Sequence, residues 1–557
     1  MKKIIIILTV FFSFTACDLD IKPETEFTNS NFWTSEANLR SFSFALYDVF
    51  LGYGNGGFFG GDHFYTTLTD DVISLEQRIE NDFPKAVPAS PSGTDWAWAD
   101  IRQANVLIDG ARKATVSESV KNKYIGVGRL FRAVLYWEKV RIFGDVPFYN
   151  APIESTDTDA LNAPRDNQVV VVDSIMADLD FAIANLESID DKTEVNKWTA
   201  LALKSRIALA AASTFKYHNV AGANAAALYQ ASYDASKELM TNGPFALHDN
   251  YTELFASEDL TGNTEAILVK IYNENMRHAI HSFIFHEPFF GYTLSAVSSY
   301  LMTDGRPIAV DGAAHPGYTE WVFNTNTEIK TSMTSYDTTV AITLNRDRRL
   351  PATVDTTRLV FLFNKGIPMY SPAKYATYPL IAAQPTQGVQ ATTDAPIIRL
   401  GEILLNYAEA AFELGTITQG DLDNTVNLLR ARGGVAPLMM AVGFSADDRD
   451  PNVDPLLWEI RRERRVELMN EPFRKWDLYR WGNGLYYNAP EVFVGVKTDP
   501  SMTFEATINP QFDANGYILP QAVGDRRQVF NEGKHYLYPL PADQLVLNPN
   551  LTQNSGW

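Results

Sequence analysis

Apolar residues recur every three to four positions over much of the chain, and this spacing predicts a mostly helical protein. In residues 34–50 the apolar side chains share one face, and Ser35 stands where a helix N-cap is expected. Residues 198–215 are apolar and alanine-rich on most sides, which predicts a buried helix. The other segments with a helical period are residues 127–144, 171–188, 397–415 and 422–434.

Residues 397–432 contain two predicted helices in succession. The first ends at Gly415, a residue type common at helix C-termini, and a short turn leads into the second. Small residues between them allow close antiparallel packing, which is the structure of a tetratricopeptide-like unit. No strict 34-residue period is visible, so the pattern predicts repeat-like helix pairs rather than a regular array.

Four long segments lack a helical period, and they are rich in Gly, Pro and aromatic residues. Short strand-like runs such as RLVFLF at 358–363 occur between turn signals. Long loops in a compact chain are usually functional or disordered, and their aromatic content favours order. We expect a helical scaffold at about 32–270 and 396–482, loop-rich insertions at 273–395 and 485–557, and further loops at 52–98 and 434–457.

The first 16 residues resemble a bacterial lipoprotein signal peptide. Lys2 and Lys3 precede an apolar run that is too short to span a bilayer, and a small residue directly precedes Cys17. On this resemblance Cys17 becomes the lipid-bearing first residue of the mature chain. Residues 17–31 would form an acidic tether to a single domain at 32–557. An ordinary signal peptide with an incidental cysteine is the alternative.

Cys17 is the only cysteine, so no intramolecular disulfide and no cysteine-based metal site can form. Apolar residues make up 46% of the chain, which is sufficient for a large core without disulfides. The net charge of −20 becomes −22 when residues 1–16 are removed, because they hold two lysines and no acid. Such a charge disfavours binding to nucleic acid or to anionic lipid.

The chain lacks the motifs of common enzyme classes. GYGNGG at 52–57 matches a dinucleotide-binding pattern, but no predicted strand precedes it and no predicted helix follows it. His278 and His281 are three residues apart, and no third metal ligand is apparent. We expect no cofactor and no enzymatic activity. A surface glycoside hydrolase is the least favoured alternative, because the 67 acidic residues offer many carboxylate pairs.

Five segments carry a resemblance to one protein family. They are GVGRLFRAVLYWEKVRIFGDVPFY at 126–149, PIIRLGEILLNYAEAAFELG at 396–415, VNLLRARGG at 426–434, IRRERRVELMNEPFRKWDLYRWG at 460–482 and YLYPLPADQLVLNPNLTQNSGW at 536–557. On these motifs the chain resembles the SusD/RagB family of outer-membrane nutrient-binding lipoproteins. It departs from the family pattern at residues 470–473, where Glu-Gly-x-Arg is usual.

The resemblance implies a mostly α SusD-like fold, with four tetratricopeptide-like helix pairs and a loop-rich irregular half with short strands. It implies a protein that is lipid-anchored on the outer surface of the outer membrane. There it would bind oligosaccharide or polysaccharide, without catalysis, and deliver it to a SusC-like TonB-dependent transporter. The same lid role for a peptide or another nutrient is the alternative.

The loops also contain the side chains that a carbohydrate site requires. Sugar C–H groups pack on aromatic faces, and hydroxyl groups pair with polar side chains. The predicted ligand-binding residues are Asp71, Arg78, Trp96, Phe290, Tyr292 and Trp321. Core packing is the alternative for the aromatic residues, and a mutual ion pair is the alternative for the two charged ones.

Other aromatic and charged residues are predicted to be structural. Trp98 begins a helical period and is expected in the core. The run IRRERR at 460–465 is expected on a solvated or ion-paired helix face rather than at an anion site. The pairs Trp476–Asp477 and Arg480–Trp481 are expected to make scaffold contacts.

Overall fold

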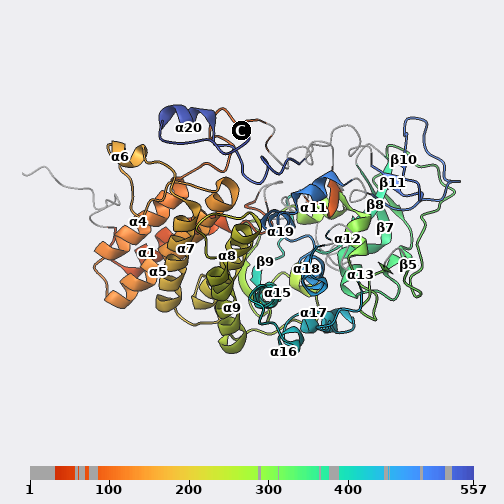
Figure 1. The fold of residues 1–557 in the computed structure, drawn as a ribbon, viewed down its shortest axis with the longest axis horizontal. Coiled ribbons are helices and arrows are strands. Elements are labelled where there is room, and N and C mark those ends of the chain that lie inside the picture. The colour runs from red at the N-terminus through yellow and green to blue at the C-terminus, as the bar shows by residue number, and fades with distance from the viewer. Residues whose placement is uncertain are drawn as a thin grey trace, which may run out of the picture.

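The computed structural model describes the larger part of the chain. The described residues are 32–56, 61, 69–74, 84, 86–285, 290–310, 313–362, 366–375, 388–444, 450, 452–489, 494–520 and 530–557. The predictions for Cys17 and Arg78 lie outside them. The molecule is elongated, with long helices at one end and short helices and strands at the other (Figure 1).

Long helices make up the end that is coloured red to yellow in Figure 1. They are α1 Glu36–Ser43, α4 Ala99–Lys113, α5 Glu118–Phe143, α7 Gln168–Asn185, α8 Lys197–Tyr217 and α9 Ala225–Asn242. α15 Leu400–Glu413, drawn in teal, comes from later in the chain and lies beside this end. Shorter elements between them are η1 Phe44–Val49, α6 Thr158–Leu161 and α10 Glu253–Ala256. α4 packs on α5, α5 on α7, and α8 on α7 and α9. α15 closes the row by packing on α8 and α9.

Local signals set the ends of these helices. The Ser35 hydroxyl accepts a hydrogen bond from the Asn38 N–H at 3.3 Å, which confirms the predicted N-cap of α1. α5 ends before Gly144 and α15 before Gly415, whose φ angles of 71° and 70° favour glycine. The helix boundaries therefore follow from neighbouring residues.

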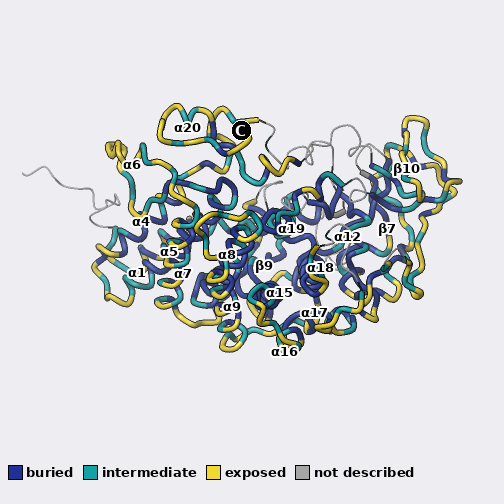
Figure 2. The backbone as a smooth tube through the Cα atoms, viewed as in Figure 1, coloured by how far each residue is buried: buried dark blue, intermediate teal, exposed yellow. Residues whose placement is uncertain are grey.

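The apolar faces of the helices meet in the largest core of the described residues. Leu130, Phe131 and Leu179 are fully covered there, and the Ala-rich face of α8 packs among them. Figure 2 shows this interior as buried and the connecting loops as exposed. Each fully buried apolar side chain of this size contributes about 1.5–3 kcal/mol, so the helical end is stable without disulfides.

The other end is built around a mixed core that includes a five-stranded antiparallel sheet. The strands are β1 Val72–Ser74, β3 Phe290–Tyr292, β8 Ile367–Pro372, β7 Val354–Leu362 and β6 Ser335–Asp337, in that spatial order. Residues 358–362 of the predicted strand-like run form part of β7. Short elements surround the sheet: α11 Ile280–Phe285, α12 Leu294–Ser298, β4 Ala309–Val310, β5 Ala313–Ala314, η2 Ala341–Thr343, α13 Arg349–Thr353, η3 Gly484–Asn488, β10 Gln511–Phe512 and β11 Ile518–Leu519.

The two ends are joined by paired strands, by helices and by buried charges. The joining elements are β2 Ala266–Lys270, β9 Ala395–Arg399, α16 Gln419–Asp423, α17 Val426–Gly433, α18 Pro455–Glu467 and α19 Arg474–Arg480, and α20 Ala542–Leu547 lies near the C-terminus. β2 pairs with β9, and α15 packs on α18. Glu467 is fully buried and accepts hydrogen bonds from Arg349, Arg399 and Arg432, at 2.8, 2.6 and 2.5 Å.

The structure confirms a mostly α fold with few short strands. The description of the helices as four tetratricopeptide-like pairs stays a prediction, as do the boundaries of signal, tether and domain. The run at 460–465 was expected on a solvated or an ion-paired helix face. Arg464 and Arg465 are ion-paired, and they are buried rather than solvated.

Candidate functional site

Three of the aromatic residues that were predicted to bind ligand are buried. Trp96 is 3% exposed, and its ring meets Phe143 and Trp98 edge-on at centroid distances of 4.9 and 5.2 Å. Phe290 and Tyr292 are at most 1% exposed. Their ring faces are covered by protein, so the prediction that these residues present a platform to ligand is corrected. Trp98, which was expected in the core, is only partly buried.

Phe290 and Tyr292 flank Gly291 on a central strand. Tyr292 pairs with Tyr370 of β8, and a Cβ atom at Gly291 would lie 2.2 Å from the Cβ of Met369. Glycine is therefore required for the close approach of β3 to β8. These aromatic residues hold the sheet together, and core packing accounts for them.

Asp71 belongs to a buried ion-pair cluster rather than to an open site. It is 3% exposed, and its carboxylate accepts a hydrogen bond from Arg465 Nε at 2.7 Å. The neighbouring Asp70 binds Arg474 through two bonds of 2.8 and 2.7 Å. Burial raises the pKa of Asp71, and Arg465 opposes this shift. The predicted role in ligand binding is therefore corrected to a structural one.

Trp321 stays partly exposed and lies in a group of surface side chains. Its ring centroid is 6.3 Å from that of Tyr370. The adjacent Glu320 binds both Lys497 and the hydroxyl of Tyr517. We call Tyr318, Glu320, Trp321, Lys497 and Tyr517 the Trp321 surface. It retains the combination of aromatic faces and fixed polar groups that the sequence predicted for this loop region.

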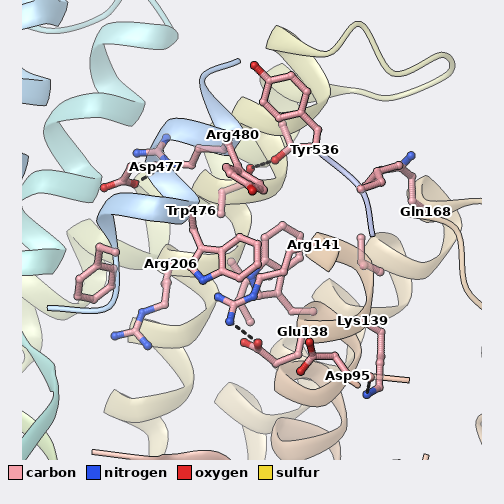
Figure 3. A pocket seen from close by; sticks show the side chains of 18 of the residues that line it. Asp95, Glu138, Lys139, Arg141, Gln168, Arg206, Trp476, Asp477, Arg480 and Tyr536 are labelled. Atoms are coloured by element: carbon pink, nitrogen blue, oxygen red, sulfur yellow. Dashed lines mark hydrogen bonds and ion pairs between the residues drawn. The ribbon is translucent and has the colours of Figure 1, made fainter. Parts of the chain in front are cut away.

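A cavity of about 680 Å³ lies between α5, α8, α19 and residues 532–537 (Figure 3). Its volume falls in the range of small-molecule sites. Apolar side chains form much of the wall, and ten lining residues are labelled in Figure 3: Asp95, Glu138, Lys139, Arg141, Gln168, Arg206, Trp476, Asp477, Arg480 and Tyr536. We call this space the Trp476 cavity.

The partly exposed indole of Trp476 is held by charged groups of α5. The Arg141 guanidinium lies 4.1 Å from the Trp476 ring centroid and pairs with Glu138. Burial raises the pKa of Glu138, and the Arg141 charge opposes the shift. Lys139 donates a hydrogen bond to the Asp95 carbonyl oxygen, and burial lowers the pKa of Lys139. The aromatic ring therefore stands beside polar groups that are already fixed in position.

Other lining charges are also paired. Arg206 donates two hydrogen bonds to Glu402, at 2.7 and 2.6 Å, and its guanidinium lies 5.1 Å from the Phe473 ring. Asp477 accepts from both Arg464 and Arg480 at 2.8 Å. Paired charges present directed donors and acceptors without an uncompensated charge, which suits a neutral polyhydroxyl ligand.

The sequence assigned Trp476 to the scaffold. Asp477, Arg480 and Trp481 are at most 5% exposed, which agrees with that interpretation. Trp476 also packs against the core, but it is partly exposed and lines the cavity together with Asp477 and Arg480. Arg141 comes from a helix that is distant in sequence, and no local period connects the two residues. The only available signal was that both lie in segments that resemble the family motifs.

No group of three or more His, Cys, Asp or Glu could hold a metal ion in the part of the chain that the structure describes. His278 and His281 are buried, and Nε2 of His278 lies 2.9 Å from the Thr393 carbonyl oxygen. Among the described helices, none is both long and apolar enough to cross a membrane.

Two family models match this chain. The SusD family model matches residues 288–557, and a model described as starch-binding associating with outer membrane matches residues 93–238. The chain belongs to the SusD/RagB family. The SusD/RagB models thus cover both the helical end and the mixed end of the molecule.

Curated relatives agree with this membership. SusD-like protein P25 of Formosa agariphila is 23% identical over 274 residues, which are 46% of this chain and 49% of the relative. A SusD-like protein of Bacteroides ovatus is 24% identical over 48% of this chain and 49% of the relative. This chain thus spans about half the length of these two relatives. SusD-like protein P2 of Formosa agariphila is 24% identical over 100% of this chain and 99% of the relative.

Solved structures share the SusD-like fold. A SusD-like carbohydrate-binding protein from Bacteroides fragilis superposes with a TM-score of 0.71 and 22% identity, covering 94% of this chain and 100% of the other. A laminarin-binding SusD-like protein superposes with a TM-score of 0.58 and 18% identity, covering 94% and 100%.

Proposed function

We propose that the protein binds an oligosaccharide at the cell surface and delivers it, chemically unchanged, to a SusC-like TonB-dependent transporter of the outer membrane. Membership of the SusD/RagB family supports this function, as does the match of residues 93–238 to a model described as starch-binding associating with outer membrane. The observation that carries it is the partly exposed Trp476 ring, set among fixed charged groups in a cavity of about 680 Å³. A sugar ring packs on such a face while its hydroxyl groups bond to the surrounding polar atoms.

The arginine pairing of two cavity carboxylates, Glu138 and Asp477, favours binding over hydrolysis. A glycosidase requires one carboxyl group as acid and a second as base or nucleophile. Glu138 is held by Arg141, and Asp477 is held by two arginines. These carboxylates act as fixed acceptors in the proposal. Release of reducing sugar by the purified protein would instead support the hydrolase alternative.

Replacing Trp476 by alanine should weaken oligosaccharide binding about tenfold or more, because loss of an aromatic face removes on the order of 1.5–3 kcal/mol of contact. The ligand is first selected by screening the purified protein against polysaccharides and peptides. Isothermal titration calorimetry of Trp476→Ala with that ligand then gives the change in Kd. Binding of peptides but not of polysaccharides would support the alternative that the nutrient is a peptide.

Trp321→Ala is the matched control for this experiment, because it removes a partly exposed indole from a different surface. Binding that persists in Trp321→Ala and fails in Trp476→Ala supports the Trp476 cavity. The reverse result would move the site to the Trp321 surface. Circular dichroism of both variants shows whether each one is folded.

We also propose that Cys17 carries the lipid anchor. Cys17→Ala should abolish palmitate labelling and release the protein from the membrane fraction. The purified variant should keep its fold and its ligand affinity, because residues 1–31 precede all described elements. Membrane retention without lipid would show that another contact, such as the transporter, holds the protein. Unchanged palmitate labelling would disprove the assignment of Cys17.

A further inference from the structure

A second cavity, of about 110 Å³, lies between α12, α18 and α19. Its described lining residues are all different from those of the Trp476 cavity. One face of α18 forms a wall, since positions 458, 461, 462 and 465 are three or four residues apart. Arginine is the most frequent side chain in this wall, and serine hydroxyls of α12 face the same space.

Three of the four lining arginines are matched by carboxylates at short distance. The pairs are Arg462–Glu459 at 2.8 Å, Arg465–Asp71 at 2.7 Å and Arg474–Asp70 at 2.7 Å. These pairs are buried or nearly so, and each one neutralises its own charge. They fix the shape of the wall, and the lining charges outside these three pairs are those of Arg461 and Asp450.

Arg461 is the arginine without a close carboxylate. It is 4% exposed, and its nearest paired oxygen is Glu413 Oε1, 4.0 Å from Nη2. Glu413 is already bound by Lys216 and by the Tyr217 hydroxyl. Within the described chain, Nε and Nη2 of Arg461 have no hydrogen-bond acceptor. The guanidinium lies over the Trp481 ring at 4.4 Å, but its only carboxylate contact in the described chain is 4.0 Å long. A buried guanidinium that is paired so loosely favours entry of an anion that binds it directly.

The lining also contains neutral polar groups and one carboxylate. The buried Nε1–H of Trp458 finds no acceptor among the described residues. The Ser295 hydroxyl accepts a hydrogen bond from Arg465 at 3.2 Å. The carboxylate of Asp450 also lines the cavity, and it accepts from the neutral groups of Asn483 and Tyr486.

We propose that this cavity binds a small oxyanion: a sulfate, phosphate or carboxylate group, either free or as a substituent of a larger ligand. Such a group has three to five non-hydrogen atoms and is compatible with a space of about 110 Å³. It supplies acceptors for Nε–H and Nη2–H of Arg461 and for Nε1–H of Trp458. The site is independent of the Trp476 cavity, so it stands whether or not a glycan binds there.

The test is a titration of the full-length protein, ¹⁵N-labelled on tryptophan, with sodium sulfate, sodium phosphate and sodium acetate at constant ionic strength. The indole N–H resonance of Trp458, assigned by its disappearance in Trp458→Phe, should move in a saturable way with at least one anion. Arg461→Gln should lower the affinity for that anion at least about tenfold, because a charge-assisted contact is lost. Titrations with glucose 6-sulfate, with glucose and with free sulfate then show whether the anion is a substituent or a free ion. Tighter binding of glucose 6-sulfate than of either glucose or sulfate identifies a substituent.

Arg112→Gln is the matched control, since Arg112 is exposed on α4 and carries the same charge. It should leave the anion affinity unchanged. An equal loss of anion affinity in Arg112→Gln and Arg461→Gln would indicate a nonspecific effect of charge and would overturn the proposal. A Trp458 resonance that no anion moves would overturn it too, and would leave water as the occupant. If Arg461→Gln does not fold, calorimetry on Trp458→Phe decides, because this variant keeps an aromatic ring, removes the indole donor and should bind the anion several-fold more weakly.

Discussion

Replacing Glu467 by alanine should lower the free energy of unfolding by about 3–5 kcal/mol, the cost of leaving buried charges without their partner. Glu467 is fully buried, and its carboxylate accepts from Arg349, Arg399 and Arg432. Burial disfavours the charged form, but Arg432, Arg399 and Arg349 together hold the pKa of Glu467 well below its usual range. The alanine variant would keep all three guanidinium groups buried. Urea denaturation followed by circular dichroism measures the change.

Glu118→Ala is the matched control for this prediction. Glu118 pairs with Lys121 at 2.8 Å, but 79% of its side chain is exposed. Exposed ion pairs contribute about 0–1 kcal/mol, so this variant should unfold almost as the parent does. Similar losses of unfolding free energy in the two variants would show that burial does not strengthen the ion pairs of Glu467. A loss below about 1 kcal/mol in Glu467→Ala would show that the freed arginines find other partners or water.

The same network shows what the sequence reveals and what it does not. Ser35, Gly144 and Gly415 act within one helical turn, so their effects on helix ends were predictable. The charges at 460–467 instead find partners on β9, α13 and α17, far away in sequence. Helical spacing identifies a charged face, but it does not show whether that face meets water or another set of charges.

Aromatic residues were misassigned for a related reason. Trp96 follows a loop rich in Pro, Ser and Gly and lies outside the helical period, which indicated exposure. It is buried because Phe143, from the far end of α5, packs on its ring. Trp476 was assigned to the scaffold, yet it lines a cavity to which α5, α8 and the C-terminal segment contribute. Whether a ring is covered or open depends on which distant elements close over it.

Lowering the pH from about 6.5 towards 4 should destabilise the protein through His278 and His281. Burial lowers the pKa of His278 from 6.5 to about 3, with a further contribution from the neighbouring His281. Burial likewise lowers the pKa of His281 from 6.5 to about 4. Between these values and 6.5 the unfolded chain binds protons that the folded chain does not. Stability is therefore complete above pH 6.5 and falls as the pH drops, by up to about 3–5 kcal/mol for each histidine.

His278→Gln should remove the largest part of this dependence. Nε2 of His278 lies 2.9 Å from the Thr393 carbonyl oxygen, and Nδ1 accepts from the Ile280 N–H at 3.4 Å. These contacts require the neutral ring, with its proton on Nε2, and a glutamine amide can donate to Thr393 without titrating. The free energy of unfolding, measured by urea denaturation between pH 7 and 4.5, should fall less steeply in His278→Gln than in the parent. Parallel curves for His278→Gln and the parent would mean that other groups set the acid sensitivity, because a proton taken up only on unfolding must change the slope.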